Sequence, residues 1–353
     1  MRGGNQRMLP IHSYDETTMR AAIVGIAGPE LTAAEAALFR AHPPAGVILF
    51  ARNVVDPSQV QALTAELRAV LPAKAVLMVD QEGGRVARLR PPHWRAHPPA
   101  AAIGALYAAA PAAGLRAAWL TGALIGADCA ACGFDVVCAP VLDLAIAAAH
   151  AVIGDRAYGP DPTAVAALAR AVAQGLLAAG IQPVGKHAPG HGRALADSHL
   201  ALPVVDIPDL SADLAPFIAN ADLPWMMTAH ILYPALDPAC PATLSAPIIR
   251  DIIRGRIGFQ GVLVTDDLAM HALSGEPAEL ALRALAAGCD VALYCPGDPA
   301  PTAALLAAVP PLTPLAARRM AAAAELARTR FAGGARLALD PAAFEAERNG
   351  LLA

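Results

Sequence analysis

The pair Asp197 and His199, two residues apart, is the clearest candidate for acid–base chemistry in this 353-residue chain. A carboxylate beside an imidazole orients the ring and stabilises its cationic form, which makes a proton donor tuned near neutral pH. In a solvent-facing loop the same two residues would have no chemical role. This segment by itself leaves both interpretations open.

A second candidate is the pair Asp266 and Asp267, which directly follows an apolar run. An aspartate at the end of a buried strand can attack an anomeric carbon or stabilise an oxocarbenium-like transition state. Asp is also a common cap for the first turn of a helix. The two residues can divide these roles, and their order does not decide which takes which.

The third candidate segment runs from Asp80 to Arg88 and contains Gly83 and Gly84. The two glycines permit positive φ, so a loop can fold tightly beside a ligand. Asp80 and Arg88 could then both reach sugar hydroxyls. The alternative is a surface turn held by an ion pair between them.

Lys186 and His187 also follow an apolar run. His187 and His191 have the spacing of a helical metal pair, but Pro189 and Gly190 between them should break a helix. We therefore expect no metal site here.

These segments need elements that bring them together. Eight short, continuously apolar runs predict strands buried on both faces of a parallel sheet. They span residues 23–27, 47–50, 76–79, 135–142, 181–185, 225–229, 262–265 and 291–294. Segments of helical character follow them, at residues 31–41, 58–71, 114–132, 162–180, 210–220, 246–255, 277–288 and 300–309. Thr32 and Glu35 could form a capping box, and Gly180 and Gly288 lie where helices should end.

Eight strands, each followed by a helix, predict an α/β fold with a single (β/α)8 TIM-type barrel. A dinucleotide-binding sheet is set aside because no complete G-x-G-x-x-G follows the first strand. We expect residues 1–18 to be a poorly ordered leader, 19–340 the barrel, and 341–353 a tail that ends loosely after a helix from Pro314. Polar or cysteine residues follow six of the predicted strands, where a barrel carries its active site: Asp80, Asp143, Lys186 with His187, His230, Asp266 with Asp267, and Cys295.

Composition excludes several classes of function. The net charge is −4 and the 26 Lys and Arg residues are scattered, unlike a nucleic-acid surface. No apolar stretch reaches the roughly 18–20 residues of a membrane span, and the first 19 residues lack the apolar region of a secretory signal. The six cysteines are expected to be small buried residues in a reducing compartment. We therefore expect a cytoplasmic protein.

Seven segments in order resemble the bacterial β-N-acetylglucosaminidases of glycoside hydrolase family 3. They are GVILFARN (46–53), VDQEGGRVARL (79–89), APVLDL (139–144), IGDRAYG (153–159), KHAPGHG with DSH (186–199), MTAHILYPALD (227–237) and TDDLAM (265–270). The match covers most of the chain, and the DSH element separates this branch from the family's β-glucosidases. One departure is Ala188, where the family usually has Phe after Lys-His; lost aromatic bulk there could loosen the loop that carries His199.

The resemblance implies a retaining mechanism with a glycosyl-enzyme intermediate, Asp266 as nucleophile, and His199 as acid/base supported by Asp197. Most retaining glycosidases use a second carboxylate for the proton transfer. A histidine suits the step because its unperturbed pKa of about 6.5 lets it give and accept a proton. The resemblance also implies the residues that hold the sugar, namely Asp80, Arg88, Arg156, Lys186 and His187.

Relatives of this cytoplasmic, single-domain type remove N-acetylglucosamine from 1,6-anhydro-N-acetylmuramyl peptides in peptidoglycan recycling. The resemblance thus implies a muropeptide disaccharide as substrate and no cofactor. We expect a monomer that binds neither nucleic acid nor membrane. A phosphorylase is an alternative, because His199 would not repel phosphate as a carboxylate would. A non-catalytic sugar-binding protein and a metal-dependent barrel lyase are further alternatives.

Overall fold

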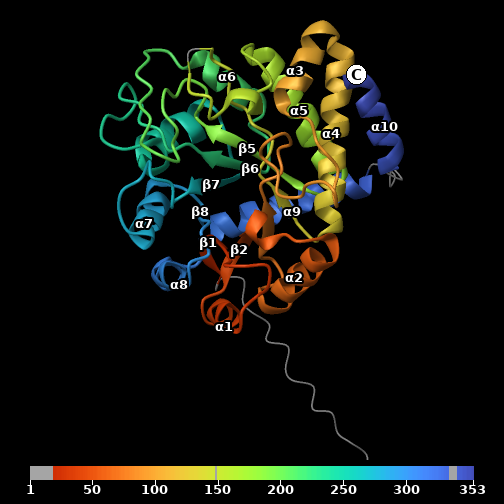
Figure 1. Cartoon of the computed structure of the whole chain (residues 1–353). Coiled ribbons are helices and arrows are strands. Elements are labelled where there is room, and N and C mark those ends of the chain that lie inside the picture. The colour runs from red at the N-terminus through yellow and green to blue at the C-terminus, as the bar shows by residue number, and fades with distance from the viewer. Residues whose placement is uncertain (1–18, 148, 334–339) are drawn as a thin grey trace, which may run out of the picture.

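A closed barrel of eight parallel strands forms the centre of the molecule (Figure 1). The structure, a computed structural model, describes residues 19–147, 149–333 and 340–353; the predicted leader, residues 1–18, lies outside them. The (β/α)8 prediction is confirmed, with a strand at each of the eight predicted places. The strands are β1 (Arg20–Gly25), β2 (Pro44–Leu49), β3 (Val76–Val79), β4 (Val136–Val137), β5 (Gln182–Ala188), β6 (Trp225–Thr228), β7 (Val262–Asp267) and β8 (Val291–Tyr294).

The strands are buried along nearly their whole length, as continuous apolar runs require. β1 pairs with both β2 and β8, which closes the barrel. The register shifts between Gly185 and Ala188 of β5 and between Val264 and Asp267 of β7. Such irregularities re-aim side chains, and these two fall where the strands carry Lys186 and Asp266.

Helices surround the barrel, and the local signals explain where they begin and end. Thr32 and Glu35 form the predicted capping box, and Gly288 ends its helix with φ +119°. The predicted helices are α1 (Ala33–Ala41), α2 (Pro57–Val70), α4 (Pro111–Ala131), α5 (Pro162–Ala178), α6 (Ser211–Ala219), the π-helix η5 (Ile248–Arg256), α7 (Pro277–Ala287), α8 (Pro299–Ala308) and α9 (Pro314–Gly333). Short 3₁₀ turns lie at η2 (Ala51–Asn53), η3 (Gly154–Arg156) and η4 (Ala242–Leu244). Within the described residues, no helix combines the length and apolar character needed to cross a membrane.

Two helices were not expected from the sequence. α3 (Ala100–Ala109) precedes α4, and its N-cap, Pro99, makes no side-chain cap bond that would have marked it. The loose end expected after α9 is wrong, because Pro341–Leu352 form α10. Asp340 caps this helix by accepting from the next backbone N–H groups, and a proline at the first turn suits its start. α10 packs along α4 (Figure 1).

α10 is tied to the loop that follows β3 through a buried polar chain. The guanidinium of Arg348, which is 1% exposed, donates to Nδ1 of His97 at 3.0 Å and to the carbonyl of Ala96 at 3.1 Å. Burial lowers the pKa of His97, so its ring is neutral and can donate from Nε2 to Asp128, 3.1 Å away, while Nδ1 accepts. The carbonyl of His97 accepts from the backbone N–H of Gly84 at 2.9 Å. The C-terminal helix thus supports the glycine loop.

Arg348→Ala should lower the free energy of unfolding by about 1–3 kcal/mol, because it leaves the buried acceptors of the loop unsatisfied. Arg328→Ala is the matched control: Arg328 forms an exposed ion pair with Glu325 on α9, so its loss should change stability by less than about 0.5 kcal/mol. Urea unfolding measures both. Equal effects of the two substitutions would contradict the role given to Arg348.

Candidate active site

All eight residues that the resemblance assigns to the site line one pocket of about 290 Å³ at the carboxyl ends of the strands. This volume is at the lower end of the about 300–1,000 Å³ typical of pockets for drug-sized ligands, which suits a single sugar ring. The structure therefore brings the predicted residues together, while their individual roles stay predictions. They are Asp80, Arg88, Arg156, Lys186, His187, Asp197, His199 and Asp266.

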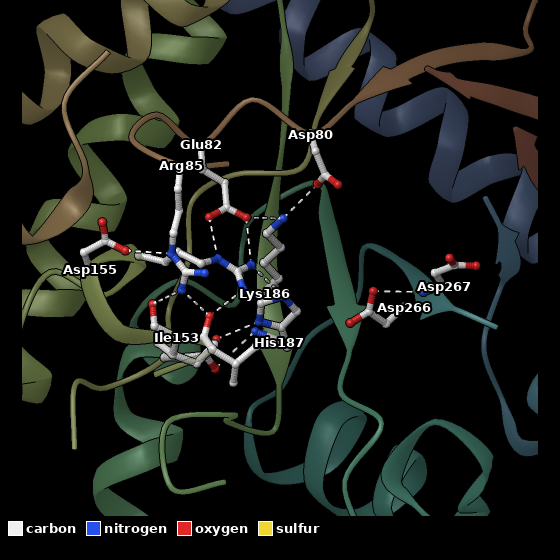
Figure 2. Close-up of polar contacts among 12 residues, drawn as sticks. Asp80, Glu82, Arg85, Ile153, Asp155, Lys186, His187, Asp266 and Asp267 are labelled. Atoms are coloured by element: carbon white, nitrogen blue, oxygen red, sulfur yellow. Dashed lines mark hydrogen bonds and ion pairs between the residues drawn. The ribbon is translucent and has the colours of Figure 1, made fainter. Parts of the chain in front are cut away.

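Lys186 lies buried between two carboxylates. Its Nζ is 3.0 Å from Asp80 and 2.6 Å from Glu82, and Figure 2 shows the side chain pointing between them. Burial opposes charge on all three groups, but their mutual attraction outweighs it. The pKa values of Asp80 and Glu82 are therefore lowered and that of Lys186 is raised. The three groups are charged at neutral pH and fixed in place before any ligand binds.

Glu82 is a site residue that the sequence reasoning missed. Its carboxylate accepts two hydrogen bonds from the guanidinium of Arg156, at 2.8 and 2.9 Å, in addition to the bond from Lys186. Arg156 comes from η3, so Glu82 joins that loop to β5. The signal that could have indicated Glu82 was its position in the strand-end segment, two residues after Asp80 and beside Gly83 and Gly84. These glycines have φ values of +102° and +54°, which are positive as expected.

Glu82→Gln should destabilise the protein at neutral pH and flatten its acid sensitivity. The pKa of Glu82 is lower in the folded protein than its ordinary value of 4.5. Its ion pairs therefore contribute stability that is fully present above about pH 4.5 and lost as pH falls below it. Removing one partner of a buried pair costs about 3–5 kcal/mol, so the variant should lose this at pH 7 and show a shallower decline of Tm between about pH 5 and pH 3.

Thermal unfolding across this pH range tests the prediction. Glu325→Gln, in an exposed pair on α9, is the control and should leave the wild-type curve unchanged. An acid decline as steep in Glu82→Gln as in the wild type would contradict the assignment.

Asp143, in the segment that follows β4, contacts His187 of β5 and His191 just after that strand. Its Oδ2 is 2.6 Å from Nδ1 of His187, and its Oδ1 accepts from the backbone N–H of His191 at 2.6 Å. The rings of His187 and His191 meet edge to face, 5.7 Å apart. Among the described residues, no group of three or more His, Cys, Asp or Glu side chains is arranged to hold a metal ion. Asp143 was noticed as a strand-end residue, but its role depends on a pairing across two strands.

Asp266 and Asp267 have different environments, which the sequence could not distinguish. Asp267 Oδ1 accepts from the backbone N–H groups of Ala269 and Cys295, both at 3.0 Å, so it fixes the turn after β7 against β8. Within the described part of the chain, the one hydrogen bond that Asp266 accepts comes from the N–H of Asp267 at 2.8 Å (Figure 2). Burial raises the pKa of Asp267. For Asp266 burial is outweighed by electrostatic interactions with His187, His230 and Lys186 and by the N–H bond, and its pKa is lowered.

Asp197 and His199 form the predicted pair at the edge of the pocket. Asp197 Oδ1 is 2.7 Å from Nδ1 of His199 and also accepts its backbone N–H at 2.9 Å. Burial is outweighed by these contacts with His199, so the pKa of Asp197 is lowered. Among the described residues His199 Nε2 has no partner, and the side chain is 61% exposed. The carboxylate therefore holds one ring nitrogen and leaves the other available for proton transfer.

Arg88 lies on the pocket wall, held there by Asp80 and Phe50. One terminal nitrogen of its guanidinium donates to Asp80 at 3.0 Å, and the group lies over the Phe50 ring. Its Nε is buried and has no partner in the described part of the chain. A buried donor without a partner costs free energy. The place of Arg88 beside the pocket therefore rests on its ion pair and ring contact, and its part in holding the sugar stays a prediction.

Ala188, which replaces the family's usual Phe, is fully buried at the end of β5. Its carbonyl accepts from the backbone N–H of Ala229 at 2.7 Å, so the strand still pairs here. The expectation that the missing aromatic ring loosens the His199 loop stays a prediction.

Comparison with known proteins agrees with this geometry. The Glycosyl hydrolase family 3 N terminal domain matches residues 18–328. The chain belongs to glycoside hydrolase family 3. The family 3 enzyme is 43% identical over 306 residues to a beta-hexosaminidase of Chromobacterium violaceum, spanning 84% of this chain and 85% of that protein. It is 41% identical over 282 residues to a beta-hexosaminidase of Bordetella avium, spanning 77% and 79%.

Solved structures lead to the same family. Native NagZ from Neisseria gonorrhoeae superposes with a TM-score of 0.83 at 32% identity and covers 95% of this chain and 98% of its own. A second NagZ structure, in complex with N-trifluoroacetyl-D-glucosamine, has the same TM-score at 31% identity and the same coverage. The family 3 enzyme is therefore a glycoside hydrolase of the β-hexosaminidase group.

Proposed function

We propose that the family 3 enzyme is a retaining exo-β-N-acetylglucosaminidase that works through a covalent bond between the sugar and Asp266. Its proposed substrate is the disaccharide of N-acetylglucosamine and 1,6-anhydro-N-acetylmuramic acid that carries a peptide, as in peptidoglycan recycling. It would act in the cytoplasm as a monomer and without a cofactor.

The observation that carries the proposal is the division between two carboxylate groups in one pocket. Asp266 is ionised and, among the residues that the structure describes, makes one short polar contact, so its second oxygen can attack. Asp197 uses its Oδ1 to hold both the ring and the backbone of His199, which suits it to support the proton carrier. An ionised nucleophile and a separate proton carrier are the two parts a retaining glycosidase needs.

The reaction follows from these positions. In the first step an Asp266 oxygen attacks the anomeric carbon, the glycosidic bond breaks, and Nε2–H of His199 protonates the departing oxygen. In the second step Nε2 takes a proton from water, the water oxygen attacks the same carbon, and the Asp266 carboxylate leaves. Asp197 stabilises the cationic ring that exists before the first step and after the second.

The sugar preference is supported by the pocket and by one relative. Asp80, Arg88 and Lys186 line the pocket, so its wall carries both acceptor and donor groups of the kinds that bind hydroxyls. The NagZ of Neisseria gonorrhoeae has been solved with an N-acylated glucosamine bound. The cationic groups around the pocket would also suit an anionic lactyl-peptide aglycone.

Turnover of 4-nitrophenyl N-acetyl-β-D-glucosaminide beside the matching glucoside tests the proposal. Release from the N-acetyl sugar alone, with the β-anomer of N-acetylglucosamine formed first, supports a retaining glucosaminidase. Preference for the glucoside would overturn the sugar assignment. No release from either would leave a sugar-binding protein.

Two further outcomes separate the alternatives. Adding inorganic phosphate should leave the product unchanged; formation of the sugar 1-phosphate would instead identify a phosphorylase. A strain that lacks the protein should accumulate the N-acetylglucosaminyl-anhydromuramyl peptide, and absence of that accumulation would count against the recycling substrate.

A further inference from the structure

Ser198, the residue between Asp197 and His199, is buried, whereas the side chain of His199 faces solvent. Ser198 is 2% exposed, whereas the side chain of His199 is 61% exposed. On either side of them the loop presents Leu195 and Leu200 to solvent. The pair that would transfer the proton therefore lies on an exposed loop. Ser198 is the residue between the two whose side chain is buried against the barrel.

Ser198 is held from two sides by the barrel. Its hydroxyl oxygen is 3.0 Å from Nε2 of His191, in the segment that follows β5. Its carbonyl accepts from the backbone N–H of Ala272 at 3.1 Å, in the segment that follows β7 and Asp266. The two contacts fix the loop between the strand that carries Lys186 and the strand that carries Asp266.

His191 is itself rigidly placed. Its backbone N–H donates to Asp143 at 2.6 Å and its ring packs against that of His187. The preceding residue is fixed as well, because the Tyr233 hydroxyl donates to the carbonyl of Gly190 at 2.6 Å. Side chains whose own positions are locked by packing and hydrogen bonds can hold a reactive group in place.

The ring of His191 is suited to this bond at neutral pH. Burial, together with the neighbouring His187, lowers its pKa to about 4, so it is neutral under working conditions. A neutral imidazole has one donor and one acceptor nitrogen. Since a hydroxyl both donates and accepts, the contact with Ser198 forms in either tautomer.

We propose that His191 and Ser198 are positioning residues that dock the Asp197–His199 loop onto the barrel and so set His199 at the distance from Asp266 that proton transfer needs. This inference rests on the proposed function. It assigns no contact with the sugar to either residue, and their effect reaches the reaction only through His199.

The test compares kcat/KM for two N-acetyl-β-D-glucosaminides, one with a methyl and one with a 2,4-dinitrophenyl leaving group. This ratio reports the steps up to cleavage of the glycosidic bond, and only the methyl glycoside needs a proton from His199. Ser198→Ala and His191→Leu should each lower it about 10- to 100-fold for the methyl glycoside. For the dinitrophenyl glycoside it should stay within about twofold of the wild type.

A double-mutant cycle makes the test specific. In the His199→Ala background, Ser198→Ala should have no further effect on the methyl glycoside, because the group it positions is gone. His191→Gln, whose amide can still bond to Ser198, should recover part of the loss seen in His191→Leu. Leu195→Ala changes the exposed surface of the same loop and is the control expected to behave as wild type on both substrates.

Equal losses on the two glycosides would overturn the inference, since they would mean that the residues bind substrate or maintain the fold. Additive losses in the His199→Ala background would overturn it as well. If His199→Ala itself showed no dependence on the leaving group, the acid role in the proposed function would fail. If His199→Ala depended on the leaving group and Ser198→Ala did not, only the docking inference would fail.

Discussion

Asp266→Ala should reduce turnover of N-acetyl-β-D-glucosaminides by at least about a thousandfold, as expected for loss of a nucleophile. The fold should survive, because in the described structure this side chain makes one hydrogen bond, to the N–H of the next residue. Measurement of kcat beside a thermal unfolding curve separates the two effects. Survival of more than about a tenth of the activity would mean that another group attacks the sugar.

Asp267→Asn is the matched comparison for this substitution. Asparagine keeps a side-chain oxygen for the N–H groups of Ala269 and Cys295 and removes only the charge. If Asp266 is the nucleophile, the neighbouring variant should retain most of its turnover. If Asp267→Asn lost more turnover than Asp266→Ala, Asp267 and not Asp266 would be the nucleophile.

His199→Ala should lower kcat/KM by about 10²- to 10⁴-fold for a methyl glycoside, which needs protonation of its leaving group. For a dinitrophenyl glycoside the first step should proceed almost normally, because that leaving group departs as an anion. The second step then lacks its base, so the glycosyl-enzyme should accumulate. Intact-mass measurement should show protein heavier by one N-acetylhexosamine residue, and peptide mapping should place it on Asp266.

Equal losses on both glycosides, or no accumulated adduct with the activated one, would remove the acid/base role from His199. Asp197→Asn provides a graded control. It keeps an oxygen near Nδ1 of His199 but removes the charge that stabilises the cationic ring. Its losses should follow the same dependence on the leaving group and be smaller than those of His199→Ala.

The barrel was predictable because its strands are buried on both faces and therefore carry continuous apolar runs. Helix ends were predictable where a short-range signal exists, as at Thr32 with Glu35 and at Gly288. α3 has no such cap. α10 has one in Asp340, but its buried face depends on Arg348, whose partner His97 lies 251 residues away. A buried arginine in a polar helix is not visible in a pattern of apolar residues.

The site was predictable to the extent that chemistry follows the strand ends. Asp80, Lys186 and Asp266 occupy such places, and the structure brings them to one pocket. Glu82 was not predicted, since an acidic residue in a glycine loop resembles a surface residue in the sequence. Its burial depends on an ion pair with Arg156, which belongs to another element. The difference between Asp266 and Asp267 likewise depends on which backbone N–H groups β8 presents, and this is a property of the assembled barrel.

The chain of contacts from α10 to the glycine loop affects how the enzyme can change over generations. In the described structure the hydrogen bonds of Arg348 and His97 go to Gly84, Ala96, Asp128 and Asn349, yet through Gly84 they support the loop that carries Asp80, Glu82 and Arg88 to the pocket. Substitutions in α10 should therefore be recovered in a random screen for altered KM. Mutations in α10 could thus adjust substrate affinity gradually, while every group proposed to contact the sugar is kept.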